Sequence, residues 1–141
     1  MADTLPTQIQ LAVVTPDRQV VDEAVESVSI PGKNGYLGIL PGHSPLLSEL
    51  TVGELDYSAQ GKRHVMSVCW GFAEVLPDRV IILAQSAERA EDIDVERAER
   101  AKGRAEERLK KSTDPEIDVE RARASLEKAI SRIQIAHKMH R

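Results

Sequence analysis

The hydrophobic pattern changes its period within residues 80–105, whose sequence is VIILAQSAERAEDIDVERAERAKGRA. The stretch begins with an apolar run that contains Val80, Ile82 and Ala84 at a spacing of two. A period of two is typical of a strand with one face in a core. Further along, apolar residues recur at helical spacing: Ala98, Ala101, Ala105 and Leu109. That is the pattern of an amphipathic helix, so the stretch joins a β unit to a helical unit.

The composition changes at the same place, near residue 88. Seven of the eight glycines and all four aromatic residues lie before it. Residues 88–141 contain 14 of the 19 Lys and Arg residues and 13 of the 23 Asp and Glu residues. Such a change indicates two structural units. We therefore predict a β domain over residues 1–88 and a helical domain over residues 89–141.

Short apolar alternations recur through the first domain. They include three sets: Ile9, Leu11 and Val13; Val28 and Ile30; Met66, Val68 and Trp70. Turn sequences such as Thr15-Pro16-Asp17 separate them. Many short strands predict a sandwich, and no helical pattern interrupts them as a parallel sheet would require. The predicted fold is α+β: an N-terminal antiparallel β-sandwich followed by a C-terminal antiparallel two-helix hairpin.

The helical domain contains a second apolar repeat, formed by Val119, Ala122, Leu126, Ala129, Ile130 and Ile133. Asp94 and Asp118 stand where N-cap residues or first-turn acids are expected. Pro115 disfavours a helical residue 114, so the first helix should end before it. An alanine-rich face buries little apolar area, and Gly103 costs about 1 kcal/mol relative to Ala. We therefore expect a marginally stable hairpin that could serve as a moving part.

Charge and composition argue against several classes of protein. The formal net charge over 141 residues is −4, whereas free nucleic-acid binders usually carry a basic excess. A single cysteine permits no internal disulfide, which fits a reducing compartment. We find neither a secretory leader pattern nor an apolar run of roughly 18–20 residues, so we expect neither secretion nor a spanning helix.

No catalytic constellation is present in the sequence. The four histidines share no metal-ligand spacing with Cys69, so we predict no metal site. No glycine-rich stretch has Walker spacing, and Ser44 and Ser48 lack a nucleophile-elbow context. We therefore expect a protein that is not an enzyme and that requires no cofactor.

One stretch is specific. Residues 35–46, GYLGILPGHSPL, resemble the G-x-L-G-I-L-P-G-H-x-P-L signature of the ε subunit of bacterial F-type ATP synthases. The VVTP of residues 13–16 and the WGFAEV of residues 70–75 also resemble sequences of that family, with Trp70 in place of a glycine. The similarity continues into the helical domain through residues 82–94. The chain is thereby identified as a member of this family.

The resemblance implies a non-catalytic subunit of the central rotor stalk. Its partners would be the γ subunit, the c ring and the catalytic α and β subunits of a proton-translocating synthase, with no nucleic acid among them. It would lie peripherally, through the complex, at the cytoplasmic face of the bacterial inner membrane. The hairpin would either fold against the sandwich or extend along γ into the catalytic head. The extended state would restrain ATP hydrolysis.

The signature turn supplies the predicted interface with the rotor ring and γ: Tyr36, Leu37, Leu40 and His43. Three glycines and two prolines shape residues 35–45, so the turn could equally be structural. Tyr36 stands where many members of the family have an acid, which weakens any charge-based contact with the c ring. An exposed Tyr can still contribute to an interface.

The resemblance also implies an ATP site in the hairpin. The IDVERA of residues 93–98 fits the I/L-D-x-x-R-A pattern of ATP-binding ε subunits, and Lys128 replaces an Arg of those proteins. The predicted site residues are Glu88, Ile93, Asp94, Arg97, Ala98, Arg104, Lys128 and Arg132. Arg presents a planar fork to phosphate, whereas Lys keeps only the charge, so weakened binding is expected. ATP would be a regulatory ligand.

Basic residues recur along the first helix: Arg97, Arg100, Arg104, Arg108 and Lys111. One reading is a solvated face with ion pairs such as Glu96–Arg100 and Glu107–Lys111. The other is a face for an anionic partner, either ATP or acidic loops of the catalytic subunits. A free-standing ATP-sensing module remains the alternative function. Binding to nucleic acid is weakly supported, because the 14 basic residues in residues 88–141 are balanced by 13 acidic residues.

Overall fold

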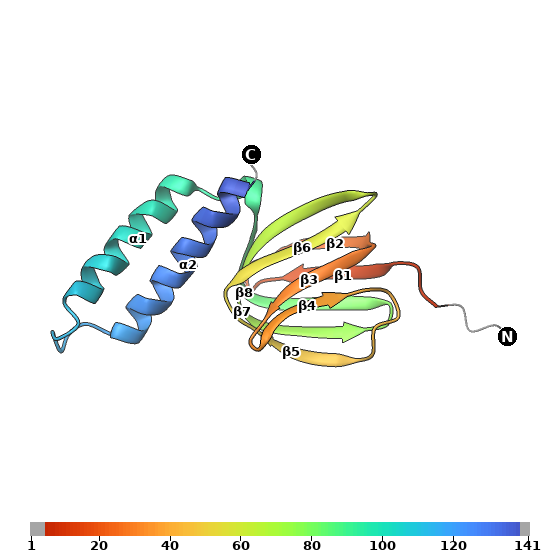
Figure 1. Cartoon of the computed structure of the whole chain (residues 1–141), viewed down its shortest axis with the longest axis horizontal. Coiled ribbons are helices and arrows are strands. Elements are labelled where there is room, and N and C mark those ends of the chain that lie inside the picture. Colours follow the sequence, from red (N-terminus) through yellow and green to blue (C-terminus); the bar gives the residue numbers. More distant parts are fainter. Residues whose placement is uncertain (1–4, 139–141) are drawn as a thin grey trace. The chain divides into compact units, whose positions relative to one another are not determined.

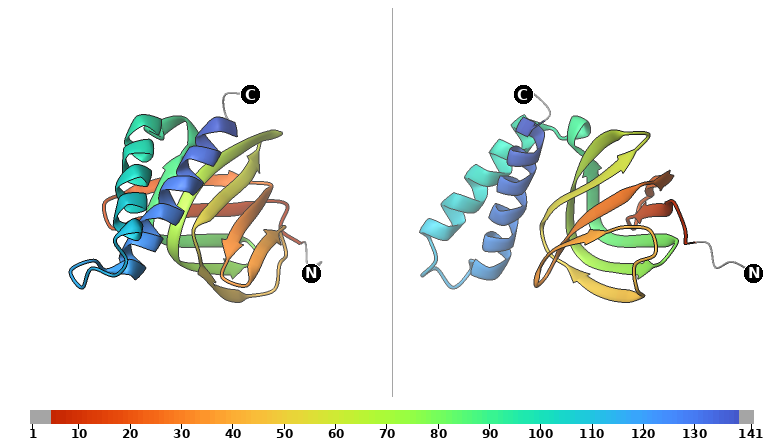
Figure 2. Two further views of the ribbon diagram at one scale, coloured as in Figure 1. Left: turned by 60° about the vertical axis from the view of Figure 1, so that its left-hand side comes forward. Right: turned by 45° about the vertical axis from the view of Figure 1, so that its right-hand side comes forward.

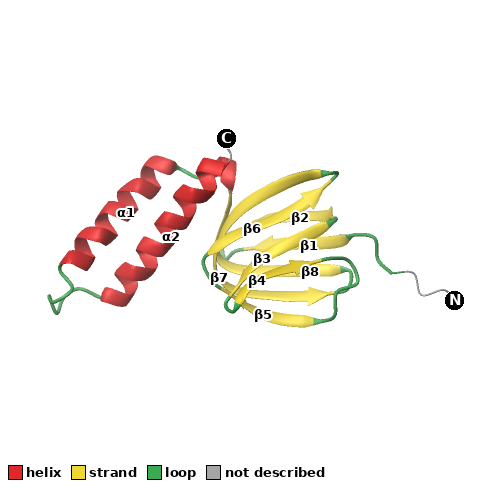
Figure 3. Cartoon of the chain, viewed as in Figure 1, coloured by secondary structure: helices red, strands yellow, loops and turns green. Residues whose placement is uncertain are grey.

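The computed structural model describes residues 5–138, which divide after Arg89 into two units. The first unit consists of the strands, drawn yellow in Figure 3 and labelled in Figure 1. Their bounds are β1 (Ile9–Val14), β2 (Gln19–Val25), β3 (Ser27–Gly32), β4 (Gly35–Ile39), β5 (Leu46–Leu50), β6 (Gly53–Ala59), β7 (Lys62–Leu76) and β8 (Arg79–Arg89). The second unit contains η1 (Ala90–Asp92), α1 (Val95–Lys110) and α2 (Val119–Lys138). The predicted fold class is confirmed; residues 1–4 and 139–141 of the predicted domains lie outside the described residues.

The strands pair in the order β2-β1-β8-β7-β5-β3-β4, and β6 pairs with both β3 and β7. Neighbouring strands are antiparallel, except that β1 and β8 run parallel. The two strands are far apart in the sequence, so no short turn between them could have revealed this pairing. Figure 2 shows from two sides how the strands curve around a common interior.

An aliphatic core fills that interior. Its largest fully buried side chains are Tyr57, Ile9, Leu11, Ile30, Ile39, Leu55, Met66, Ile82, Val13, Val25, Val68 and Val75. The alternation predicted for residues 9–13 and 28–30 holds, because Ile9, Leu11 and Val13 are each 0% exposed. Tyr57 is the one aromatic residue in this core cluster.

The alternation changes phase in the middle of β7. Met66 and Val68 face the core before this point, and Ala73 and Val75 face it afterwards. Trp70 and Gly71 lie between them with φ angles of 47° and 137°. Two consecutive residues with positive φ turn the strand and move the inward face by one residue. The prediction that Trp70 belongs to the same inward set as Met66 and Val68 is therefore wrong.

In the second unit, α1 packs against α2, and a short loop joins them. Asp94 caps α1, its Oδ1 accepting a hydrogen bond of 3.0 Å from the backbone N–H of Arg97. The Oδ1 of Asp118 accepts one of 3.1 Å from the N–H of Arg121, which confirms both predicted caps. Small residues are buried on both helices: Ala98, Ala105, Ala122, Ala129 and Ala136. Within residues 5–138, no helix is long and apolar enough to cross a membrane.

Candidate functional site

The predicted ATP-site residues divide between the two units. Glu88 is half-buried near the end of β8, in the sandwich unit. The other seven belong to the helical unit. Ile93 and Ala98 are 8% and 0% exposed, so both are packing residues within the fold as it stands. The Asp94 carboxylate already acts as the helix cap. These three positions of the motif therefore have a structural role before any ligand is considered.

The four cations of the predicted ATP site lie along one side of the hairpin. The buried alanines are spaced by seven residues on each helix and mark the row along which α1 and α2 approach. A rotation of about 100° per residue puts Arg97 and Arg104 on one flank of α1. In an antiparallel pair, Lys128 and Arg132 then lie on the same side of α2. Arg97 and Arg104 are roughly 10 Å apart along the axis. We call these four residues the cationic face.

Few carboxylates neutralise the basic residues of α1. Within residues 5–138, no ion pair joins Glu96 to Arg100 or Glu107 to Lys111, the two examples given for a solvated face with ion pairs. Glu107 instead pairs with Lys110 at 3.3 Å. In the same range of residues, the side chains of Arg97, Arg100, Arg104, Arg108 and Lys128 make neither hydrogen bonds nor ion pairs. The interpretation as a face laced with ion pairs therefore loses its support.

The signature turn presents apolar side chains to solvent. Leu40 is 65% exposed and Tyr36 is 62% exposed. The Tyr36 hydroxyl also accepts a hydrogen bond of 3.3 Å from the Glu54 N–H, which ties β4 to the start of β6. His43 donates from Nδ1 to the Ser44 carbonyl at 2.7 Å. The turn therefore combines local hydrogen bonds with exposed apolar side chains on its outer surface.

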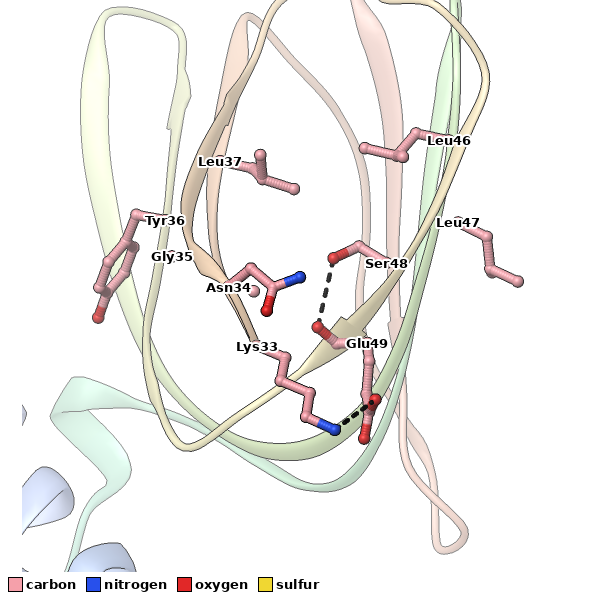
Figure 4. A pocket seen from close by; sticks show the side chains of 10 residues that line it. Lys33, Asn34, Gly35, Tyr36, Leu37, Leu46, Leu47, Ser48 and Glu49 are labelled. Atoms are coloured by element: carbon pink, nitrogen blue, oxygen red, sulfur yellow. Dashed lines mark hydrogen bonds and ion pairs between the residues drawn. The ribbon is translucent and has the colours of Figure 1, made fainter.

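A cavity of about 330 Å³ opens beside this turn (Figure 4). Tyr36 and Leu37 line it, together with residues of the β3–β4 turn and β5. One wall is polar: Lys33 forms an ion pair of 3.3 Å with Glu49. Leu46 and Leu47 supply apolar lining from β5. Of the predicted interface residues, Tyr36 and Leu37 are brought together here, whereas Leu40 and His43 are not part of the lining.

A second surface was missed by the sequence reasoning. Phe72 of β7 lies directly opposite Leu83 of β8, which in turn lies opposite Val14 of β1. Phe72 and Leu83 are 53% and 55% exposed. They line an almost wholly apolar groove of about 420 Å³ with Val14. We call these three residues the apolar ladder. The continuous apolar run of residues 80–84 was the available signal, because it left no polar residue for the outward face of β8.

The geometry defines a two-domain chain, a β-sandwich joined to a helical hairpin, whose candidate sites are open surfaces. Both domains match one family. Residues 8–90 match the beta-sandwich domain of the ATP synthase delta/epsilon chain, and residues 91–137 match its long alpha-helix domain. The chain belongs to the ATP synthase delta/epsilon chain family. Its relatives are epsilon chains, non-catalytic subunits of that synthase.

Curated relatives agree over most of the chain. The ATP synthase epsilon chain of Koribacter versatilis is 57% identical over 112 residues, which cover 79% of this chain and 76% of the relative. That of Nitratidesulfovibrio vulgaris is 48% identical and covers 90% and 94%. That of Bacillus velezensis is 45% identical and covers 91% and 96%.

Solved structures agree as well. A chain of the Euglena gracilis mitochondrial ATP synthase, in an OSCP/F1/c-ring structure, superposes with a TM-score of 0.80 at 27% identity. The match covers 93% of this chain and 83% of that one. A chain from the central stalk and c ring of the Tetrahymena thermophila mitochondrial synthase shares the fold alone, with a TM-score of 0.57 at 12% identity over 98% and 100% of the two chains.

Proposed function

We propose that this chain works in the rotating central stalk of a proton-translocating F-type ATP synthase. The sandwich would dock on the γ subunit and on the c ring, and so couple their rotation to the catalytic head. Through that complex the chain would lie at the cytoplasmic face of the bacterial inner membrane. The apolar ladder is the observation that carries the docking role. A free-standing module would have no use for such a surface.

The ladder has the composition of an interface core. Phe72 and Leu83 stand on the outward face of a sheet, where strand alternation normally places polar residues. Glu74 follows Phe72 on the same face of β7 and is exposed. Its carboxylate forms no hydrogen bond or ion pair within residues 5–138. We expect γ to cover the ladder with apolar side chains and to place a Lys or Arg near Glu74.

Titration of the full chain with γ tests the docking role. Leu83→Glu should weaken binding at least tenfold, because it places a charge in the centre of the apolar contact. Leu5→Glu is the matched control, since Leu5 is 78% exposed and lies outside the ladder. One-to-one binding by the native chain and the control, lost in Leu83→Glu, supports the proposal. Equal affinity of all three chains contradicts it, and no binding at all favours the free-standing module.

The signature turn would make the second contact, with the c ring. The exposed Leu40 and Tyr36 offer apolar area at one end of the sandwich, next to the cavity of about 330 Å³. Tyr36→Phe would remove the bond to Glu54 but keep the apolar ring, whereas Leu40→Ser would remove contact area. If the turn binds the ring, Leu40→Ser should lower the coupling of ATP hydrolysis to proton pumping in the assembled synthase more than Tyr36→Phe. Equal coupling in both variants would count against this contact.

The hairpin would regulate the synthase. Arg100 and Arg108 lie on the same flank of α1 as the cationic face and have no side-chain partner within residues 5–138. In an extended hairpin, these arginines would bind acidic segments of the catalytic subunits and restrain rotation. Replacing both by Glu should raise ATP hydrolysis by the assembled synthase several-fold without changing assembly. Unchanged hydrolysis in a fully assembled complex would refute the inhibitory role.

ATP sensing by the hairpin is a second candidate, favoured by three cations, Arg97, Arg104 and Lys128, whose side chains make neither hydrogen bonds nor ion pairs within residues 5–138. The arginine forks of Arg97 and Arg104 could hold the phosphates, and Lys128 would add charge without bidentate geometry. ATP could then stabilise one hairpin state, to the extent that it binds that state more tightly than the other.

Calorimetric titration of the isolated chain with ATP tests this candidate. Arg97→Ala should abolish one-to-one binding. Arg123→Ala is the matched control, because Arg123 is exposed on another face of the hairpin and lies outside the motif. Heat that is lost in Arg97→Ala and retained in Arg123→Ala supports a site at the cationic face. No heat at millimolar ATP would leave the basic residues to protein partners.

A further inference from the structure

Arg89 is the last residue of β8 and of the sandwich unit, and its side chain is tied back into that unit. Its Nη1 donates a hydrogen bond of 2.9 Å to the hydroxyl of Tyr57 in β6. Its Nη2 donates a weaker bond of 3.4 Å to the carbonyl oxygen of Val20 in β2. In the β7–β8 ladder, Arg89 lies opposite Met66. One side chain therefore joins the end of β8 to two further strands.

The acceptor of this bond is held firmly. Tyr57 is fully buried, and its ring stacks on that of His64 with centroids 4.9 Å apart. Burial and a hydrogen bond to Glu23 raise the pKa of the Tyr57 hydroxyl, whereas Arg89 acts in the opposite direction. The hydroxyl is thus neutral at physiological pH, and it accepts the hydrogen bond from Arg89. Both sides of the Arg89 contact are therefore fixed by the sandwich.

The next residues belong to the helical unit. The short helix η1 (Ala90–Asp92) packs against α2. The N–H of Ile93 bonds to the carbonyl of Ala90 at 3.3 Å, and α1 is capped one residue later by Asp94. Residues 90–94 are thus occupied by local structure of the hairpin. The side chain of Arg89 is fixed in the sandwich, and the backbone of the next residue, Ala90, is part of the hairpin unit. The two residues are adjacent in the sequence, so no flexible linker separates them.

We propose that Arg89 is the anchor of the hairpin hinge: its bonds to Tyr57 and Val20 keep β8 ordered to its end and confine the pivot to the Arg89–Ala90 junction. A short pivot restricts the hairpin to few orientations relative to the end of β8. Release of Arg89 lets the end of β8 fray and lengthens the pivot, which spreads the hairpin over many orientations. The regulatory meaning of this anchor rests on the hairpin function proposed above, but the anchor itself is a property of the isolated chain.

Hydrogen exchange on the full chain tests the anchor. Tyr57→Phe keeps the buried ring and removes the hydroxyl that accepts the Arg89 bond, and Arg89→Met removes the donor while keeping an apolar stem. Each should speed amide exchange at residues 87–92 by roughly tenfold or more. Exchange at residues 72–75 of β7 and in the middle of α2 should stay unchanged. Because Arg89→Met already removes the bond that Tyr57→Phe breaks, the double variant should exchange no faster than Arg89→Met alone.

Tyr36→Phe is the matched control, because it removes the hydroxyl of the other tyrosine, which accepts a bond from the Glu54 N–H, and leaves the hinge alone. Two results would overturn the anchor: unchanged exchange at residues 87–92, or an increase spread evenly over the sandwich, which would mean that Arg89 only supports global stability. Should Tyr57→Phe fail to fold, Arg89→Met decides between the same outcomes. The measurement needs neither γ nor ATP, so its result is independent of the proposed function.

Discussion

Gly71 of β7 and Leu83 of β8 approach so closely that a Cβ atom at residue 71 would overlap the carbonyl oxygen of Leu83. Gly71 also has a φ of 137°, which side chains of L-residues rarely adopt. This contact lies where β7 changes the face that it turns to the core. The contact also adjoins the apolar ladder, because Leu83 belongs to the ladder and pairs with Phe72, the residue that follows Gly71. The close approach of two backbones thus sets the position of the partner surface.

Gly71→Ala should destabilise the sandwich by at least about 2 kcal/mol, since it adds both a steric clash and an unfavourable φ. Urea unfolding followed by circular dichroism measures the change. Gly38→Ala is the control, because an added Cβ there meets no atom within 4 Å and no positive φ is required. If both variants unfold at the same urea concentration, the close approach at Gly71 does not constrain the fold.

Gly103→Ala should stabilise the hairpin by up to about 1 kcal/mol, since Gly103 is exposed in the middle of α1 with open space around it. Slower amide exchange in α1 would report the gain, with β7 amides as an internal reference. The same change tests regulation, because a more stable helix pair should alter ATP hydrolysis only if the hairpin must deform in the working synthase. Faster exchange in the variant would contradict the prediction.

Asp94 carries two predicted roles that substitution can separate. Asp94→Asn keeps an oxygen that can accept the bond from the Arg97 N–H, so helix stability should barely change. Asp94→Ala removes that oxygen and should cost about 1 kcal/mol. A loss of ATP binding in Asp94→Asn without loss of helicity would assign the carboxylate to the ligand. Equal ATP affinity in the native chain and Asp94→Asn would make the residue a cap alone.

Stability at alkaline pH should depend on Tyr57. Its pKa is raised in the folded state, mainly by burial. The neutral hydroxyl therefore contributes stability that is fully present below the unfolded value of about 10 and is lost as pH rises through the higher folded value. Urea midpoints measured across this range should fall steeply for the native chain and for Tyr36→Phe, and less steeply for Tyr57→Phe. Parallel curves for all three chains would exclude Tyr57 as the source.

The chemistry of the candidate sites was only partly readable from the sequence. The motif of residues 93–98 and the basic residues of the helices were visible as patterns, and so was the signature turn. Whether neighbouring acids neutralise the basic residues depended on side-chain geometry, and the pairs Glu96–Arg100 and Glu107–Lys111 of one of the two readings do not form. The apolar run of residues 80–84 hinted at an apolar outward face on β8, but the meeting of the three ladder residues could not be predicted, because they lie on three strands and meet only through the β1–β8 and β7–β8 registers.

Local periodicity and local capping were sufficient for the elements themselves. Alternation in residues 9–13, helical spacing around Ala98 and Ala105, and the two Asp caps all act between near neighbours, so one sequence reveals them. Contacts between distant residues were decided by the tertiary structure. The parallel β1–β8 pair and the bond from Arg89 to Tyr57 join strands far apart in the chain. Such contacts form only when the core assembles, since no local preference selects one distant partner over another.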